Sequence, residues 1–203
     1  MTVRMRSVLF LILAFSASAL AQSDFSADIV SPKNPSPFPT RIFVTKNKLR
    51  FQQQDRSGRP SSIMLVDLAA LTSVVLIPQQ HLYVKQSRPQ IPGQGVAFFQ
   101  PPYPANACRP WQEMAELQGK CRNLGSEVVN GRETVKYENV APDKSTSYIW
   151  IDTNLDFPVK WEGPVGAREL RDIQVAAQPA GLFAIPDGYS KRNLSPNKAK
   201  PAQ

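Results

Sequence analysis

Short segments of this chain alternate between apolar and polar residues. Leu49 and Phe51 alternate with Lys48, Arg50 and Gln52, which is the two-residue period of a half-buried strand. Other strand-like segments, bounded by Gly, Pro and other turn residues, are 25–30, 41–45, 62–66, 74–77, 82–85, 148–151, 159–161 and 170–175. The pattern predicts roughly eight to eleven antiparallel strands in a sandwich or barrel, rather than alternating strands and helices.

The clearest turn signal is Asn130-Gly131. It lies between the apolar end of segment 127–129 and a segment in which Val135 and Tyr137 alternate with polar residues. Asn and Gly both tolerate positive φ, as a type I′ hairpin turn requires. A tight β-hairpin is therefore predicted here.

Residues 86–120 interrupt the alternation with many prolines and several aromatic residues. Pro110 suits the first turn of a helix, and segment 111–117 carries Trp111, Met114 and Leu117 at three-residue spacing. We expect a long insertion that contains one short helix. Such an insertion is either a lid or binding loop, or a cover for one end of the sheet.

Some predicted strands are apolar on both faces. Tyr148 and Trp150 point to one side of their strand, and Ile149 and Ile151 point to the other. Both sides must then be covered, one by the insertion and the other by the sheet curling on itself. An incompletely filled curve would leave a pocket for an apolar ligand, and a filled one would be only a core. The candidate ligand-binding side chains are Phe98, Phe99, Trp111 and Met114 of the insertion and Trp150, Val159 and Trp161 of the sheet.

The first 21 residues have the pattern of a signal peptide. Arg4 and Arg6 precede the apolar run 8–15, and Ala19-Leu20-Ala21 supplies a small-x-small cleavage site. The apolar run is too short to span a bilayer, and residue 22 is Gln rather than a lipid-anchored Cys. We expect cleavage after Ala21 and a soluble periplasmic or secreted protein whose mature chain has no transmembrane segment.

The formal charge of +8 is concentrated outside the body of the chain. Arg4 and Arg6 belong to the leader, and four further bases with no acid lie in residues 190–203. The nearly neutral body argues against a nucleic-acid partner. We therefore expect one domain over residues 22–189 and a basic, disordered tail over 190–203. The tail is either a solvated end or a contact for an anionic surface.

Cys108 and Cys121 are the only cysteines. An oxidising compartment favours a structural disulfide between them, worth about 3 kcal/mol for a loop of this size. The alternative is a pair of free thiols.

Residues with catalytic or metal-binding patterns are sparse. His81 is the only histidine, and the chain has neither a G-x-S-x-G elbow nor a phosphate-binding loop. The acidic pairs Glu113/Glu116 and Asp152/Asp156 have the spacing of solvated turns or helix faces. The sequence therefore predicts no metal site, no cofactor and no enzymatic activity. An envelope hydrolase is the least favoured hypothesis.

Several segments, taken in order, resemble a secreted bacterial family of unknown function in the LolA/LolB-like superfamily. They are RIFVTKNKLRF (41–51), LIPQQHLYVK (76–85), VNGRETVKY (129–137), YIWID (148–152) with FPVKW (157–161), and LFAIPDGY (182–189). The resemblance implies a mainly β fold, in which a curved antiparallel sheet forms a half-open barrel with helices over its concave face. Superfamily members that carry lipoproteins hold acyl chains in that hollow.

The residues and the resemblance together lead to two function hypotheses. The first is a non-catalytic envelope protein that holds a lipid, an acyl chain or another hydrophobic small molecule in the hollow, in lipid or lipoprotein handling. The second is a structural or interaction protein of the envelope whose hollow is filled by its own side chains and whose partner is another envelope protein.

Overall fold

The computed structural model describes residues 24–86, 90–91, 94–95, 108 and 119–193. Within these residues, twelve strands form one sheet in the order β14-β6-β5-β4-β3-β2-β1-β13-β12-β11-β10-β9. Neighbouring strands are antiparallel except for β14, which runs parallel to β6. The strands are β1 (Phe25–Val30), β2 (Thr40–Val44), β3 (Lys48–Gln54), β4 (Pro60–Asp67), β5 (Thr72–Ile77), β6 (Leu82–Gln86), β9 (Lys120–Val129), β10 (Arg132–Val140), β11 (Thr146–Asp152), β12 (Phe157–Gly163), β13 (Gly166–Val175) and β14 (Ser190–Lys191). A separate pair joins β7 (Gln90–Ile91) to β8 (Gln94–Gly95).

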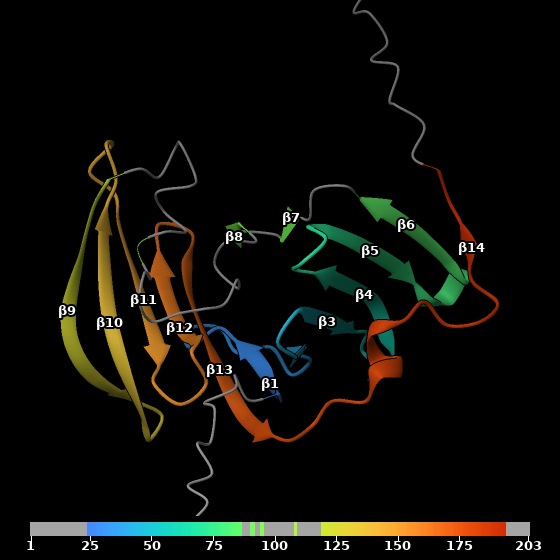
Figure 1. The fold of residues 1–203 in the computed structure, drawn as a ribbon, viewed down its shortest axis with the longest axis horizontal. Coiled ribbons are helices and arrows are strands. Elements are labelled where there is room, and N and C mark those ends of the chain that lie inside the picture. The colour runs from blue at the N-terminus through green and yellow to red at the C-terminus, as the bar shows by residue number, and fades with distance from the viewer. Residues whose placement is uncertain (1–23, 87–89, 92–93, 96–107, 109–118, 194–203) are drawn as a thin grey trace, which may run out of the picture.

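The large sheet is open and strongly curved (Figure 1). Strands β9–β13 form one wall and β1–β6 form the other. The two walls join where β1 pairs with β13, with Phe25 opposite Val175. The predicted mainly β fold with a curved sheet, consistent with a half-open barrel, is thereby confirmed.

The predicted hairpin turn is also present. Asn130 and Gly131 both have positive φ, at 50° and 77°, and connect β9 to β10. Asn and Gly adopt this left-handed conformation more readily than other residues, which is why this dipeptide was informative.

One face of the sheet, here called the inner face, carries the larger apolar cluster. In the β1–β6 wall, apolar residues of this cluster lie opposite one another on neighbouring strands, for example Val44 opposite Leu49 and Leu49 opposite Val66. The cluster continues over β13, β12 and β11 into the other wall. Its buried members are Phe25, Ala27, Ile42, Val44, Leu49, Phe51, Val66, Leu68, Ile149, Ile151, Leu155, Phe157, Val159, Trp161 and Leu170.

The opposite, outer face carries the ion pairs of the sheet, whereas Arg168, opposite Trp161, is a charged residue on the inner face. Because side chains alternate along a strand, residues adjacent to inner-face residues point outward. Six ion pairs lie on this face, and they are Arg41–Asp28, Arg122–Glu138, Arg132–Asp152, Lys136–Glu127, Lys160–Glu162 and Arg171–Glu169.

Over the β3–β6 part of the outer face lies a segment of residues 176–193, here called the C-terminal segment (Figure 1). It contains the 3-10 turn η4 (Ala180–Phe183) and β14. Its Ile185 and Tyr189 pack on a second apolar cluster, built from Ile63, Leu65 and Leu76 of β4 and β5. This segment covers the outer face of β4, a strand that is apolar on both faces, with Leu65 in the outer cluster and Val66 in the inner one.

The C-terminal segment corrects the expected domain end. A basic tail was expected from residue 190, but Ser190 and Lys191 form β14, and the Arg192 N–H donates to the Tyr83 carbonyl. The ordered sheet therefore extends past residue 189, because backbone groups of β6 pair with this part of the chain.

Other expectations are answered in part. Cys108 and Cys121 form the expected disulfide. The expected helix at 111–117, and most of the insertion, lie outside the described residues. Within the residues that are described, none of the helices has the length and apolar character needed to cross a membrane.

Candidate functional site

Val159 and Trp161 of β12 lie on the inner face, and both are buried. Trp161 is registered opposite Ile149 of β11, so these two side chains share a face. Together with Ile151 and Phe157 they form an apolar surface in the β9–β13 wall. Such a surface can pack against an alkyl or aromatic group, and it contains no group that could transfer a proton.

Trp150 lies on the other face. It is registered opposite Lys160, between inner-face residues Ile149 and Ile151 on its own strand. The expected grouping of Trp150 with Val159 and Trp161 on one concave face is therefore corrected, because alternation along β11 turns the Trp150 ring outward. The remaining expected site residues, Phe98, Phe99, Trp111 and Met114, lie outside the described residues.

The surroundings of Trp150 are charged, although its side chain is buried. The Lys136 and Lys160 Nζ atoms lie 4.6 Å and 4.2 Å from the centroid of its ring, which is favourable cation–π geometry. The indole N–H makes no close hydrogen bond. Its looser interaction with the Glu127 carboxylate is the largest cause that lowers the pKa of Glu127. Trp150 thus organises the outer face rather than lining the inner one.

Of the polar residues considered for catalysis, Asp152, Asp156 and His81 have structural surroundings, and Glu113 and Glu116 lie outside the described residues. Asp152 accepts hydrogen bonds from the Asn154 and Leu155 N–H groups and pairs with Arg132, so it holds the β11–β12 turn. Burial raises the pKa of nearby Asp156, and the negative charge of Asp152 adds to this. The His81 ring packs against Tyr189. Among the described residues, no cluster of three or more His, Cys, Asp or Glu could hold a metal ion.

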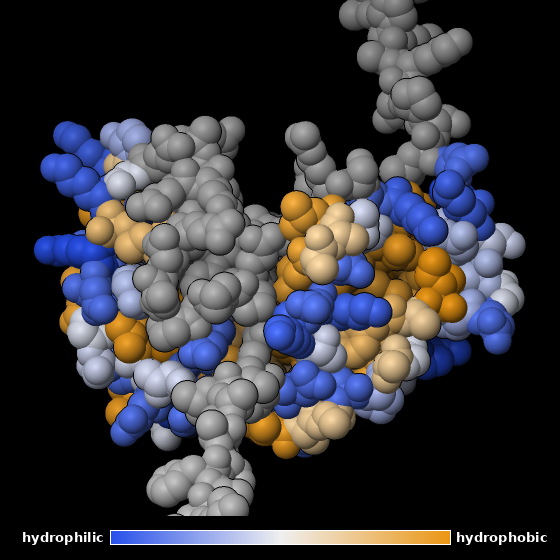
Figure 2. Space-filling view, viewed as in Figure 1, coloured by the Kyte–Doolittle hydropathy of each residue, from blue (hydrophilic) through white to orange (hydrophobic). Residues whose placement is uncertain are grey.

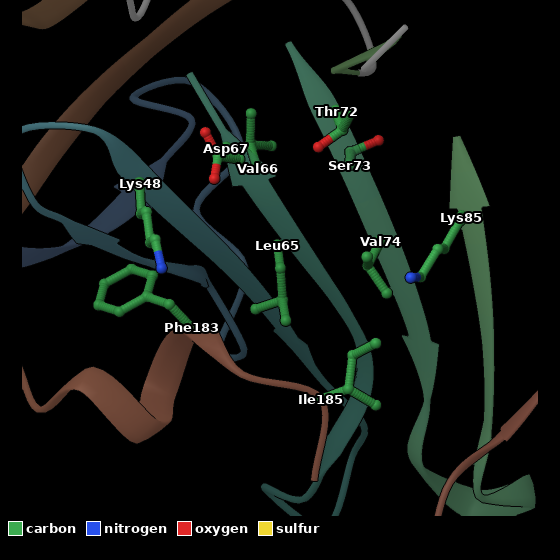
Figure 3. Close-up of a pocket in the computed structure, with 10 residues that line it drawn as sticks. All are labelled: Lys48, Leu65, Val66, Asp67, Thr72, Ser73, Val74, Lys85, Phe183 and Ile185. Carbon is green, nitrogen blue, oxygen red and sulfur yellow. The ribbon is translucent and has the colours of Figure 1, made fainter. Parts of the chain in front are cut away.

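A pocket on the outer face lies between the sheet and the C-terminal segment (Figure 3). Its volume is about 220 Å³. Strands β3–β6 contribute Lys48, Leu65, Val66, Asp67, Thr72, Ser73, Val74 and Lys85, and the C-terminal segment contributes Phe183 and Ile185. Figure 2 shows apolar side chains gathered over this wall, bordered by polar ones.

The sequence interpretation did not find this pocket. A signal existed, because Leu182, Phe183 and Ile185 are apolar residues beyond the last long strand. Their partners lie more than a hundred positions earlier: the Arg50 Nη1 group donates to the Leu182 carbonyl at 2.8 Å with a separation of 132 residues. Alternation within a strand carries no information about such a distant contact.

Comparisons with known proteins concern the fold. No protein-family model and no curated protein sequence matches this chain. Among solved structures, an uncharacterised conserved protein from Thermus thermophilus is similar at 9% identity with a TM-score of 0.52, over 85% of this chain and 93% of that one.

Two other solved structures have lower TM-scores. MucB, also solved in complex with MucA from Pseudomonas aeruginosa, has 17% identity and a TM-score of 0.47, over 81% of this chain and 57% of its own. The lipoprotein LppX of Mycobacterium tuberculosis has 13% identity and a TM-score of 0.34, over 74% of this chain and 84% of its own. The likeness to the Thermus protein shows a shared fold, and at this identity it shows the fold alone.

Proposed function

We propose that this protein is a non-catalytic binding protein of the cell envelope that holds a lipid or another hydrophobic ligand against its inner face. The observation that carries the proposal is the unequal distribution of ion pairs between the two faces of the sheet. The six ion pairs between strands or within them lie on the outer face, whereas the inner-face cluster is apolar from β4 to β11.

This separation matters because the sheet is open. In a closed barrel, an apolar inner face needs only its own side chains to be covered. An open sheet with the same face can in addition receive an apolar guest. Burial of an acyl chain contributes up to about 0.8 kcal/mol per methylene before the entropy cost of binding. The leader-like first 21 residues support placement in the envelope.

One observation favours the alternative of a self-filled envelope protein. Ile149, Ile151 and Val159 are almost completely buried without any added ligand. If these side chains keep their contacts in solution, the protein acts through its surface and an envelope partner instead. The test below separates the two functions.

The experiment uses the tryptophans as reporters. The chain has three, Trp111, Trp150 and Trp161. The W111F/W150F protein keeps Trp161 on the inner face, and its matched control, W111F/W161F, keeps Trp150 on the outer face. Each is titrated with a brominated 16-carbon fatty acid, which quenches indole fluorescence on contact.

We expect saturable quenching of Trp161 and little quenching of Trp150. Native mass spectrometry of protein prepared from its own host should then detect a co-purified lipid. Equal quenching of both reporters, or none at Trp161 with consistently ligand-free protein, would overturn the proposal and favour the self-filled alternative.

A further inference from the structure

We propose that the outer-face pocket is a second binding site, which takes a short amphipathic anion: an alkyl chain with a carboxylate or phosphate head. It lies on the opposite side of the sheet from the inner face. The proposal therefore does not depend on lipid binding by the inner face.

The pocket has an apolar floor and an apolar side. Leu65 of β4 and Val74 of β5 are registered opposite one another and form the floor. Phe183 and Ile185 of the C-terminal segment close the side that faces away from Asp67 and Thr72 (Figure 3). Removal of a few methylene groups from water against these four side chains is favourable by about 25 cal/mol per Å².

Two lysines give the pocket its preference for an anion. Lys48 of β3 and Lys85 of β6 lie on opposite sides of the floor, where the Lys48 ammonium group points toward Phe183 and the Lys85 ammonium group points toward Val74 (Figure 3). Among the described residues, neither has an ion-pair partner, unlike the outer-face lysines Lys136 and Lys160. An anionic head placed beside either ammonium group would gain a charged hydrogen-bond donor, and the second lysine would add to the positive charge of the pocket.

The one acidic side chain that lines the pocket, Asp67, lies opposite Lys48 and offsets part of the positive charge, but the two lysines outnumber it. The Asp67 carboxylate accepts hydrogen bonds from the Ala69 and Ala70 N–H groups at 3.0 Å and 2.8 Å, so it is engaged in the β4–β5 turn. In Figure 3 it lies at the end of the pocket away from Ile185. The head group would lie beside a lysine ammonium group, and the chain would lie on the floor and point toward Phe183 and Ile185.

The size of the pocket limits the ligand. A volume of about 220 Å³ is below the roughly 300–1,000 Å³ of sites for drug-sized ligands. A chain of about eight carbons is therefore a better probe than a full-length fatty acid. The hydrogen bond from Arg50 to Leu182 holds the covering segment in place without ligand, so the site exists before binding.

The test is an NMR titration of the ¹⁵N-labelled protein with three probes that share one chain length: octanoate, octyl phosphate and octan-1-ol. The variants are K48Q and K85Q, and K144Q, in the exposed β10–β11 turn, is the matched control. We expect octanoate or octyl phosphate to shift the amide signals of Leu65, Val74 and Ile185. Each pocket variant should weaken binding of the anion about two- to fivefold, the range of one partly exposed ion pair.

Octan-1-ol should bind more weakly than either anion, and K48Q and K85Q should not change its affinity. The K144Q protein should behave like the wild type. Tighter binding of octyl phosphate would identify a lipid phosphate as the natural head group, and tighter binding of octanoate a carboxylate. Three results would overturn the proposal: equal affinity for the alcohol and both anions, unchanged anion affinity in K48Q and K85Q, or signal shifts confined to inner-face residues. Of these, only shifts confined to inner-face residues would agree with ligand binding at the inner face.

Discussion

Trp150 and Trp161 lie on neighbouring strands, yet their side chains meet different surroundings. Trp161 is part of the inner-face cluster with Ile149 and Val159. Trp150 lies between two lysine ammonium groups on the outer face. The difference follows from register, because Ile149, not Trp150, is the residue opposite Trp161.

The W150F substitution should raise the pKa of Glu127 toward its ordinary value near 4.5, because the indole N–H is the largest cause that lowers it. A carboxyl pKa that is lower in the folded protein stabilises the fold above the ordinary value, and this stabilisation is lost as the pH falls through the lowered pKa. The stability deficit of W150F should therefore shrink as the pH falls from the ordinary value of 4.5 through the lowered pKa of Glu127. NMR titration of the Glu127 side chain measures the pKa, with W161F as the control that leaves it unchanged. An unaltered Glu127 pKa in W150F would contradict the assignment.

Side-chain parity within a strand could be predicted from the sequence, but the register between strands could not. The alternation around Ile149 placed Tyr148 and Trp150 together on one side, and the structure agrees. The alignment of β11 with β12 depends on the turn at 153–156 and on an irregularity between Trp150 and Ile151. Neither leaves a periodic trace in the sequence, so the sequence pattern does not show that Trp150 and Trp161 lie on opposite faces.

The C-terminal segment is the element that completes the β3–β6 wall. It contributes Ile185 and Tyr189 to an apolar cluster that the strands alone would leave open to water. Its attachment is polar as well as apolar, because the Arg50 guanidinium reaches the Leu182 carbonyl at 2.8 Å and the Gln52 side chain at 2.7 Å. Burial lowers the pKa of Arg50, as expected for a cation held under a covering segment.

Replacement of Arg50 by Ala should loosen this segment selectively. The Leu182 carbonyl loses a hydrogen bond from a charged donor, worth about 1.5–3 kcal/mol. Hydrogen–deuterium exchange should accelerate in residues 180–192 and stay unchanged in β10–β12. R41A is the control, because Arg41 is a half-buried outer-face arginine that pairs with Asp28 instead. Uniform acceleration across the sheet in R50A would show that the segment does not open on its own.

Most elements followed from local pattern. The segments expected as strands lie in β1–β6 and β10–β13, because alternation and turn residues are local properties. The C-terminal segment could not be placed by the same reasoning. Its last strand pairs with β6 over two residues only, and its apolar residues are explained by contacts with β4 and β5 far away in the sequence.

As a whole, the molecule has two different sheet edges. The short β14 covers part of β6, whereas β9 is ten residues long and, within the described part of the chain, pairs only with β10. Two features make β9 a poor template for further pairing: the charges of Lys120 and Arg122, and the irregularity near Gly125, whose φ is +95°. The disulfide at Cys121 fixes the beginning of this strand.

Removal of that disulfide by C108S/C121S should lower the free energy of unfolding by about 2–4 kcal/mol, because the cross-link restricts the unfolded chain. Urea denaturation monitored by circular dichroism measures the change. The reduced wild-type protein is the matched comparison and should lose the same amount. Equal stability of the oxidised and double-serine proteins would contradict a stabilising role.

The pairing of β1 with β13 also governs when the protein can reach its final form. Each wall is a meander of sequential neighbours, and each can begin to assemble from contacts close together in the chain. The seam between them needs Phe25 to meet Val175, so it closes only after nearly all the polypeptide has emerged. High contact order of this kind slows folding to milliseconds or longer. If the chain is exported from its N-terminus, β1 would therefore stay unpaired with β13 until late in translocation. The chain would remain incompletely folded until then.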